Sequence, residues 1–126
     1  MQVILKNNLI FTQVSIVYQG TATDISNVLV DTGSATTILA ADEVARVQIK
    51  AVPQDTIHII RGVGGVESVF TRFVDNLIVG ECNLPHFQIE VGKMAYGFEI
   101  NGILGMDFLI RAKAIINLPE MRIDFI

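Results

Sequence analysis

The hydrophobic and polar positions along this chain follow the pattern of β-strands. Leu9–Tyr18 and Thr21–Val30 are rich in Ile, Val, Thr and aromatic residues, and they meet at Gln19-Gly20, which is typical of a hairpin. The 126 residues include 18 Ile, 14 Val and 8 Thr, whereas strong helix formers occur only in short groups. A mostly β fold is therefore predicted.

The rest of the chain continues in short segments. Further strands are expected at 35–40, 56–60, 66–73, 77–79, 87–91, 114–118 and 121–125. The turn residues Asp75-Asn76 and Asn83-Leu84-Pro85 predict breaks before two of these strands. Short helices are expected at 41–46 and 105–111, because each segment carries an acidic residue near its amino end.

Length and composition indicate a single domain over residues 1–126. A chain of 126 residues with 51% hydrophobic and 17% charged residues is folded rather than disordered, and it is too short for two lobes. The formal net charge is −4, and the nine basic residues are scattered singly, so there is no basic stripe to neutralise phosphates. We therefore expect no nucleic-acid partner and no anionic membrane partner.

Signals for a membrane, a disulfide or a metal are weak. No apolar run approaches the roughly 20 residues of a spanning helix, and residues 1–6 lack the regions of a secretion signal. A soluble, cytoplasmic protein is the expectation.

Cys82 is the single cysteine, which excludes an internal disulfide and a thiolate zinc cluster. His58 and His86 are 28 positions apart without a ligand motif, so structural or surface roles are expected, with no metal and no cofactor.

A carboxylate follows one of the apolar strands. Asp31-Thr32-Gly33-Ser34 comes directly after Val28-Leu29-Val30, which places Asp31 at the mouth of a core strand rather than on a solvated turn. Asp, Gly and Ser are also ordinary residues of an Asx-type turn. At average residue frequencies Asp-Thr-Gly arises by chance in about 2 of 100 chains of this length. The tripeptide alone is therefore only suggestive.

Two further motifs accompany this tripeptide. Gly102-Ile103-Leu104-Gly105-Met106-Asp107 follows about 70 positions later as an apolar strand end with a glycine, and a Gly-rich hairpin at 60–65 lies between them. In this order and spacing, the three motifs resemble the retropepsin-like aspartic proteases, the family of the retroviral proteases and their cellular and bacterial relatives. The resemblance extends over residues 9–125.

The resemblance implies a closed, mostly β acid-protease barrel with the catalytic Asp31 at the floor of a cleft. It implies that Thr32, Gly33 and Ser34 support the active-site loop, since a hydroxyl can bond across to the neighbouring loop and a glycine lets backbone N–H groups approach the carboxylate. The implied flap is Arg61, Gly62, Val63, Gly64 and Gly65, the implied substrate pocket is Leu29, Ile38, Val63 and Ile103, and the implied structural motif is Gly102, Leu104, Gly105 and Asp107. Because the pocket positions are apolar, the expected substrates are extended polypeptides with apolar side chains near the cut bond.

Aspartic proteolysis needs two carboxylates that share one proton. The chain contains one Asp-Thr-Gly, so the second carboxylate is expected from Asp31 of another copy, in a homodimer with its site on the two-fold axis. The rival is an intrachain pair of Asp31 with Asp107. Asp107 occupies the place where the family puts a polar residue at the start of the last helix, so we interpret it as a cap or buried hydrogen-bond acceptor.

The chain departs from the viral pattern at several places. Viral members carry an acidic residue and an arginine at positions that hold Ala35 and Met106 here, so the ion pair near the viral dimer interface is missing. Residues 1–6 show no clear partner-strand pattern, which leaves open whether the two termini interleave in a shared sheet. Arg61 replaces a small residue of the flap. Two interpretations of Arg61 have equal weight: a contact with the substrate, and a solvated surface side chain.

These observations favour an aspartic endopeptidase over two alternatives. A catalytically idle dimerisation or interaction module of the same fold predicts decay of the site, yet Asp31, the flap glycines and Gly105 are all present. A generic β-barrel ligand-binding domain explains the apolar walls and leaves Asp31 unexplained.

Overall fold

The structure of the protein is a computed structural model that describes residues 1–62, 65–94 and 99–126, with the backbone alone at 60–62 and 65–67. Within these residues the strands are β1 (Ile4–Lys6), β2 (Leu9–Tyr18), β3 (Thr21–Val30), β4 (Ile38–Ala40), β5 (Ile57–Gly62), β6 (Gly65–Val79), β7 (Cys82–Gly92), β8 (Gly102–Leu104), β9 (Ala114–Asn117) and β10 (Arg122–Phe125). The helices are α1 (Ala41–Val44), the 3₁₀ turn η1 (Ala45–Val47) and α2 (Met106–Arg111). The prediction of a mostly β chain with one or two short helices is confirmed.

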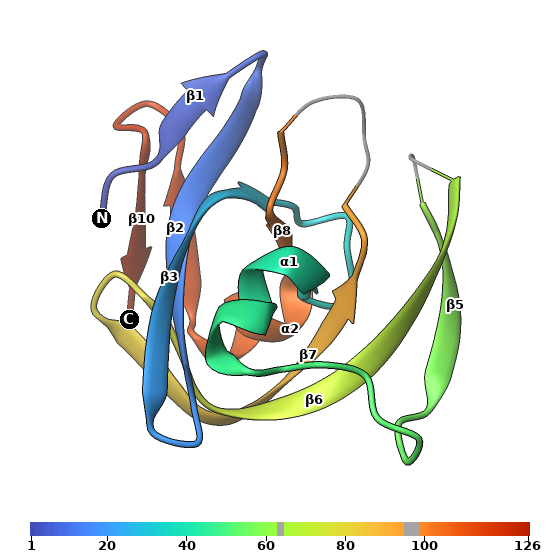
Figure 1. The fold of residues 1–126 in the computed structure, drawn as a ribbon. Helices are drawn as coiled ribbons and strands as arrows, with labels where there is room; N and C mark the ends of the chain where they lie inside the picture. The colour runs from blue at the N-terminus through green and yellow to red at the C-terminus, as the bar shows by residue number, and fades with distance from the viewer. Residues whose placement is uncertain (63–64, 95–98) are drawn as a thin grey trace.

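The strands close into a ring (Figure 1). The sheet order is β1-β2-β3-β8-β4-β7-β6-β5, and a further antiparallel pairing of β2 with β6 joins the two sides. β9 and β10 form a separate two-stranded sheet. β8 lies between β3, to which it is parallel, and β4, to which it is antiparallel. The ends of β3 and β8 are therefore neighbours, although they are far apart in the sequence.

The core is built from alternate residues of the ring and from one face of α2. Val14 and Ile16 of β2 are fully buried, as the period of a half-buried strand requires. Phe108 of α2 is also fully buried, and it meets the rings of Phe87 and Phe125 edge to face, with centroids 6.1 and 6.3 Å away. Burial of one such ring stabilises the fold by about 1.5–3 kcal/mol, so α2 is anchored by its apolar side.

Two predicted turns are wrong. Asp75-Asn76 lies inside β6 and Asn83-Leu84-Pro85 lies inside β7, and the two strands pair continuously with Asn76 opposite Pro85. The chain reverses instead at Gly80, where φ is +57°. One edge of β7 pairs with β6, and the other edge pairs with β4 only from Glu90 onward. This second edge of β7 is therefore unpaired near Pro85, where the proline, which has no N–H, is tolerated.

The two termini lie side by side in one chain (Figure 1). The Met1 ammonium donates to the Ile123 carbonyl at 2.7 Å, and the Val3 N–H donates to the Met121 carbonyl at 3.1 Å. β1 then pairs with the start of β2. The first residues thus have a partner strand that their sequence pattern did not reveal.

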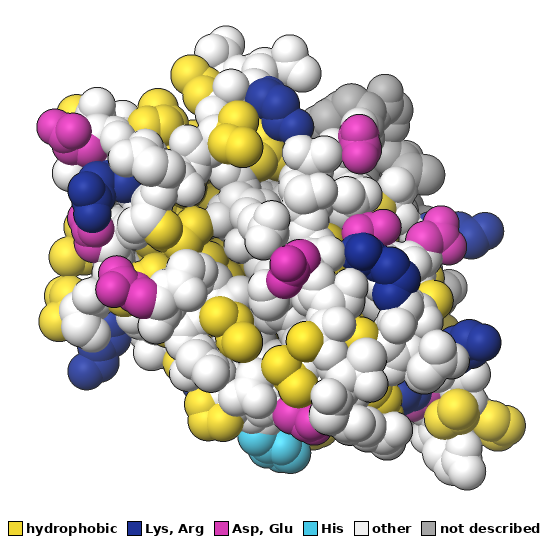
Figure 2. Space-filling model, turned by 60° about the vertical axis from the view of Figure 1, so that its left-hand side comes forward, with side chains coloured by type: hydrophobic (Ala, Val, Ile, Leu, Met, Phe, Trp, Pro, Cys, Tyr) yellow, Lys and Arg dark blue, Asp and Glu magenta, His cyan; other side chains and the backbone are white. Residues whose placement is uncertain are grey.

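The surface has a mixed charge. On the face shown in Figure 2, acidic and basic side chains are interspersed and hydrophobic side chains occur in small groups. In the part of the chain that the structure describes, no helix is long and apolar enough to cross a membrane. Val63 and Gly64 of the predicted flap lie outside the described residues, as does the side chain of Arg61.

Candidate active site

Asp31 stands at the end of β3, where the strand leaves the ring. Its N–H donates to the Leu104 carbonyl of β8 at 3.0 Å, which continues the pairing of Val30 with Leu104 by one residue. The Gly33 N–H donates to Oδ1 of the Asp31 carboxylate at 2.8 Å. A Cβ on Gly33 would lie only 3.1 Å from that oxygen. The half-buried carboxylate is thus held in place by its own loop, as the glycine in this motif predicts.

Two glycines of the second motif allow β8 to approach the loop that follows Asp31. A Cβ on Gly102 would lie 2.8 Å from the Leu39 side chain and 2.9 Å from the Ile38 carbonyl oxygen. A Cβ on Gly105 would lie 2.3 Å from the Thr36 carbonyl oxygen. A side chain at Gly105 is excluded by backbone atoms, which cannot move aside as a side chain can.

The first turn of α2 is bound to the active-site loop. The Met106 N–H donates to the Ser34 carbonyl at 2.8 Å, and the Asp107 N–H donates to the Ala35 carbonyl at 3.2 Å. The Ser34 hydroxyl donates to the Thr36 carbonyl at 2.8 Å. These loop carbonyls satisfy N–H groups that a helix start leaves without partners. Ala35 and Met106, which lack the viral charges, therefore hold the loop through their backbones.

The carboxylate of Asp107 is bound to Thr37. It accepts the Thr37 N–H at 3.1 Å, the Thr37 hydroxyl at 2.8 Å and the Phe108 N–H at 2.7 Å. The same hydroxyl accepts the Gly105 N–H at 3.1 Å. Thr37 is fully buried. Sequence reasoning missed Thr37, whose one signal is a polar residue directly before the buried strand β4.

Three of the four predicted pocket residues share one row across the ring. Ile103 pairs with Leu29 on one side and with Ile38 on the other, so the three side chains lie on the same face of the sheet. Asp31 falls on this face too, since it is two residues beyond Leu29. Val63, the fourth predicted pocket residue, lies outside the described residues.

Comparison with protein families shows the family of this chain. Residues 14–108, most of the chain, match a family described as aspartyl protease, which is of the retropepsin-like type. The chain belongs to this family. The family recognised from the sequence motifs is thereby confirmed, and an aspartyl protease acts on polypeptides. A comparison with curated proteins gave no match.

In this aspartyl protease Thr32 lies at a hollow beside the active-site loop. The hollow is lined by Thr32, Met106, Leu109, Ile110, Lys113, Ala114 and Ile116. Thr32 itself is exposed, and its hydroxyl makes no hydrogen bond with the residues that the structure describes. The predicted bond from this hydroxyl to a neighbouring loop is therefore not made within the described part of one chain.

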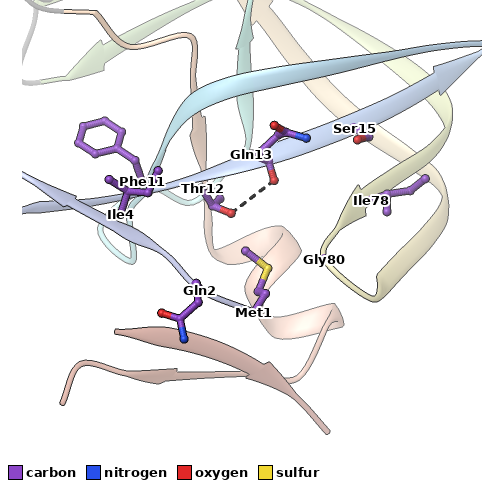
Figure 3. A pocket seen from close by; sticks show the side chains of 9 residues that line it. All are labelled: Met1, Gln2, Ile4, Phe11, Thr12, Gln13, Ser15, Ile78 and Gly80. Carbon is purple, nitrogen blue, oxygen red and sulfur yellow. Dashed lines mark hydrogen bonds between the residues drawn. The ribbon is translucent and has the colours of Figure 1, made fainter. Parts of the chain in front are cut away.

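A second pocket of the protease lies at the amino terminus, and Asp31 does not line it (Figure 3). It is lined by Met1, Gln2, Ile4, Phe11, Thr12, Gln13, Ser15, Ile78 and Gly80. The Met1 side chain is packed tightly against Gly80, where a Cβ would lie 2.7 Å from the Met1 sulfur. None of the residues predicted for catalysis lines this pocket.

Among the described residues, two further kinds of reactive site were considered, a nucleophilic cysteine and a metal centre. Burial raises the pKa of the Cys82 thiol above its ordinary value, so the thiol is mostly protonated near neutral pH and is a weak nucleophile. In 1–62, 65–94 and 99–126 no group of three or more His, Cys, Asp or Glu side chains is placed to hold a metal ion.

Proposed function

We propose that residues 1–126 form a single retropepsin-like protease domain that acts as an aspartic endopeptidase in a homodimer. The observation that carries the proposal is the Asp31 carboxylate, half-buried at the end of β3 and held by the Gly33 N–H at 2.8 Å. One such carboxylate is half of a catalytic pair. Asp31 of a second copy completes it, and the ring of strands then corresponds to one acid-protease barrel of the dimer.

The proposed reaction uses a water molecule between the two Asp31 carboxylates. The ionised carboxylate accepts a proton from the water while the oxygen attacks the peptide carbonyl carbon, and the protonated carboxylic acid donates its proton to the carbonyl oxygen. The tetrahedral intermediate is a gem-diol, and it collapses when the first carboxyl gives the proton taken from the water to the amide nitrogen, one hydroxyl of the diol gives its proton to the second carboxylate, and the C–N bond breaks. The products are a carboxylic acid and an amine, and the pair again shares one proton.

Asp107 has a structural role in this proposal. Its carboxylate is engaged by two donors of Thr37 and by the Phe108 N–H, which supports a role in holding the start of α2 rather than in sharing a proton with Asp31.

The hollow beside Asp31 supports the docking of a second copy. Ile110 on its rim is 67% exposed, and the neighbouring Ile115 of β9 is 48% exposed. Within the described residues β9 pairs on one side only, with β10, so its other edge is open to a further strand. Contact along this face would set Thr32 of one protomer near its partner and bring the two Asp31 side chains together.

The substrate is an extended polypeptide bound along the apolar row. Leu29, Ile103 and Ile38 supply an apolar wall next to Asp31, which supports a preference for apolar side chains near the cut bond. The β5–β6 hairpin, with Gly62 opposite Gly65, is proposed as the arms of the flap.

Incubation with a peptide library at mildly acidic pH tests the proposal. We expect cleavage by the native protein, with inhibition by a statine-type mimic of the tetrahedral intermediate. A folded dimer that cleaves nothing would contradict it and would support the alternative of a catalytically idle dimerisation module.

A further inference from the structure

The row of side chains that forms the apolar wall continues onto a carboxylate. Ile38 of β4 pairs with Ile103 on one side and with Glu90 of β7 on the other. Glu90 in turn pairs with Thr71 of β6. Directly paired residues place their side chains on the same face of a sheet, so Glu90 follows Leu29, Ile103 and Ile38 in one row.

This row lies on the face opposite the hydrophobic core. Ile89 and Val91, which flank Glu90 along β7, are buried in the core, and so is Leu39 next to Ile38. Side chains alternate between the two faces of a strand, so Glu90 and Ile38 point away from that core. Ile38 is buried, yet it is not a member of the core cluster, as its position on the opposite face requires.

The Glu90 carboxylate has a neutral partner in the described structure. The Thr36 hydroxyl of the active-site loop donates to its Oε1. Arg72, a neighbour along β6, instead forms an ion pair with Asp55 at 2.7 Å. Among the described side chains, no cation lies within ion-pair distance of Glu90, although the group is partly withdrawn from water. A partly buried carboxylate gains from a cationic partner that completes its hydrogen bonds.

We propose that Glu90 makes one substrate subsite of this protease selective for a lysine or arginine side chain. The inference rests on the proposed endopeptidase function and adds the substrate class of that site. A Lys or Arg side chain has an apolar stem and a charged end, so the stem packs on Ile38 while the charge reaches Glu90. In a two-fold dimer each protomer contributes one Glu90, and the preference is expected on both sides of the cut bond.

Paired peptides test this inference. A sequence cut by the native protein is resynthesised with lysine, or with norleucine as its uncharged counterpart, at each of the four positions on either side of the cut bond. We expect kcat/KM to be about tenfold or more higher for lysine at one position on each side, the range of a charge-assisted hydrogen bond. Glu90→Gln keeps an oxygen for the Thr36 hydroxyl and removes the charge, so the ratio of kcat/KM between lysine and norleucine peptides should fall to about one.

The control variant is Glu81→Gln, which removes the same charge from the exposed turn between β6 and β7 and should keep the preference. Binding of the same peptides to Asp31→Asn, followed by fluorescence anisotropy, separates the two proposals. If the native protein cuts no peptide of the library, lysine and norleucine versions of an apolar library peptide are compared instead. Tighter binding of the lysine version by Asp31→Asn, lost when Glu90→Gln is added, would leave the subsite standing while the endopeptidase function fails. If peptides are cut with equal rates for lysine and norleucine at every position, or if Glu90→Gln keeps the preference, the subsite is overturned.

Discussion

The buried hydroxyl of Thr37 donates a hydrogen bond to the carboxylate of Asp107 at 2.8 Å, although the two residues are 70 positions apart in the chain. The same hydroxyl accepts the N–H of Gly105. One side chain therefore joins the loop that carries Asp31 to the start of α2. The geometry of the active-site loop depends on this contact as well as on the residues of the motif itself.

Thr37→Val should destabilise the fold. Valine has the shape of threonine but leaves the Gly105 N–H without its buried acceptor and removes one of the two donors to Oδ1 of Asp107, a loss of about 1–3 kcal/mol in the free energy of unfolding. Urea denaturation at a fixed protein concentration measures the change. Thr21→Val, at the exposed start of β3, is the control and should change little. Equal stability of the two variants would show that the hydroxyl of Thr37 is not needed.

Gly105→Ala should be far more damaging than Gly20→Ala. The new Cβ at Gly105 would lie 2.3 Å from the Thr36 carbonyl oxygen, whereas at Gly20 nothing lies within 4 Å and the penalty comes from a φ of +83°. Positive φ at a residue with a Cβ costs about 1–2 kcal/mol, and a backbone clash costs more. Thermal melting compares the two variants, and a milder effect at Gly105 would contradict the close approach of β8.

Ile110→Asp should disrupt the proposed homodimer and leave a folded monomer. The side chain is 67% exposed, so the folded monomer tolerates a charge there, whereas burial of that charge between two copies is unfavourable. Sedimentation across a dilution series measures the state, together with peptide cleavage per mole of protein. Val52→Asp, on the exposed segment before β5, should remain dimeric and active. Full activity of a strictly monomeric Ile110→Asp would rule out a shared site.

The Cys82 thiol should react at higher pH in the folded protein than in the unfolded chain. Burial raises its pKa above the ordinary value of 9.0, and alkylation by iodoacetamide requires the thiolate. The folded state then keeps the proton to a higher pH than the unfolded state. The contribution of the Cys82 thiol to the free energy of unfolding is therefore complete at a pH below its pKa in the unfolded chain. This contribution is lost as the pH rises through the pKa of the thiol in the folded protein. Cys82→Ala should remove this alkaline loss, and identical alkylation profiles with and without urea would contradict it.

The local pattern of hydrophobic and polar residues was sufficient to predict most of the strands. The alternation of Met121, Ile123 and Phe125 with polar residues predicted the last strand, and Gln19-Gly20 predicted the β2–β3 hairpin, because these signals depend on neighbours in the sequence. The predicted turn at Asp75-Asn76 is wrong because the long pairing of β6 with β7 overrides the preference of two residues for a turn.

The parts of the site that escaped prediction depend on contacts between distant segments. Thr37 and Glu90 carry no local motif. The role of Thr37 arises from its bond to Asp107, 70 positions away, and the role proposed for Glu90 arises from its pairing with Ile38. Asp31 could be named in advance because its motif is local. The contacts of residues 1–3 with the last strand likewise became visible only in the structure, through bonds such as that from Met1 to the Ile123 carbonyl.

Peptide cleavage by Asp31→Asn tests the central claim most directly. An amide keeps the shape of the carboxylic acid but can neither accept the proton of the water nor share a proton with its symmetry mate. Asp107→Asn is the matched control and should lower stability before it lowers the rate. Measured on folded dimers, we expect kcat to fall by about 10⁴-fold or more for Asp31→Asn, at least the upper end of the range for general acid–base assistance. Near-normal cleavage by Asp31→Asn, with loss of cleavage by a folded Asp107→Asn, would contradict the pairing of two Asp31 side chains and favour a pair within one chain.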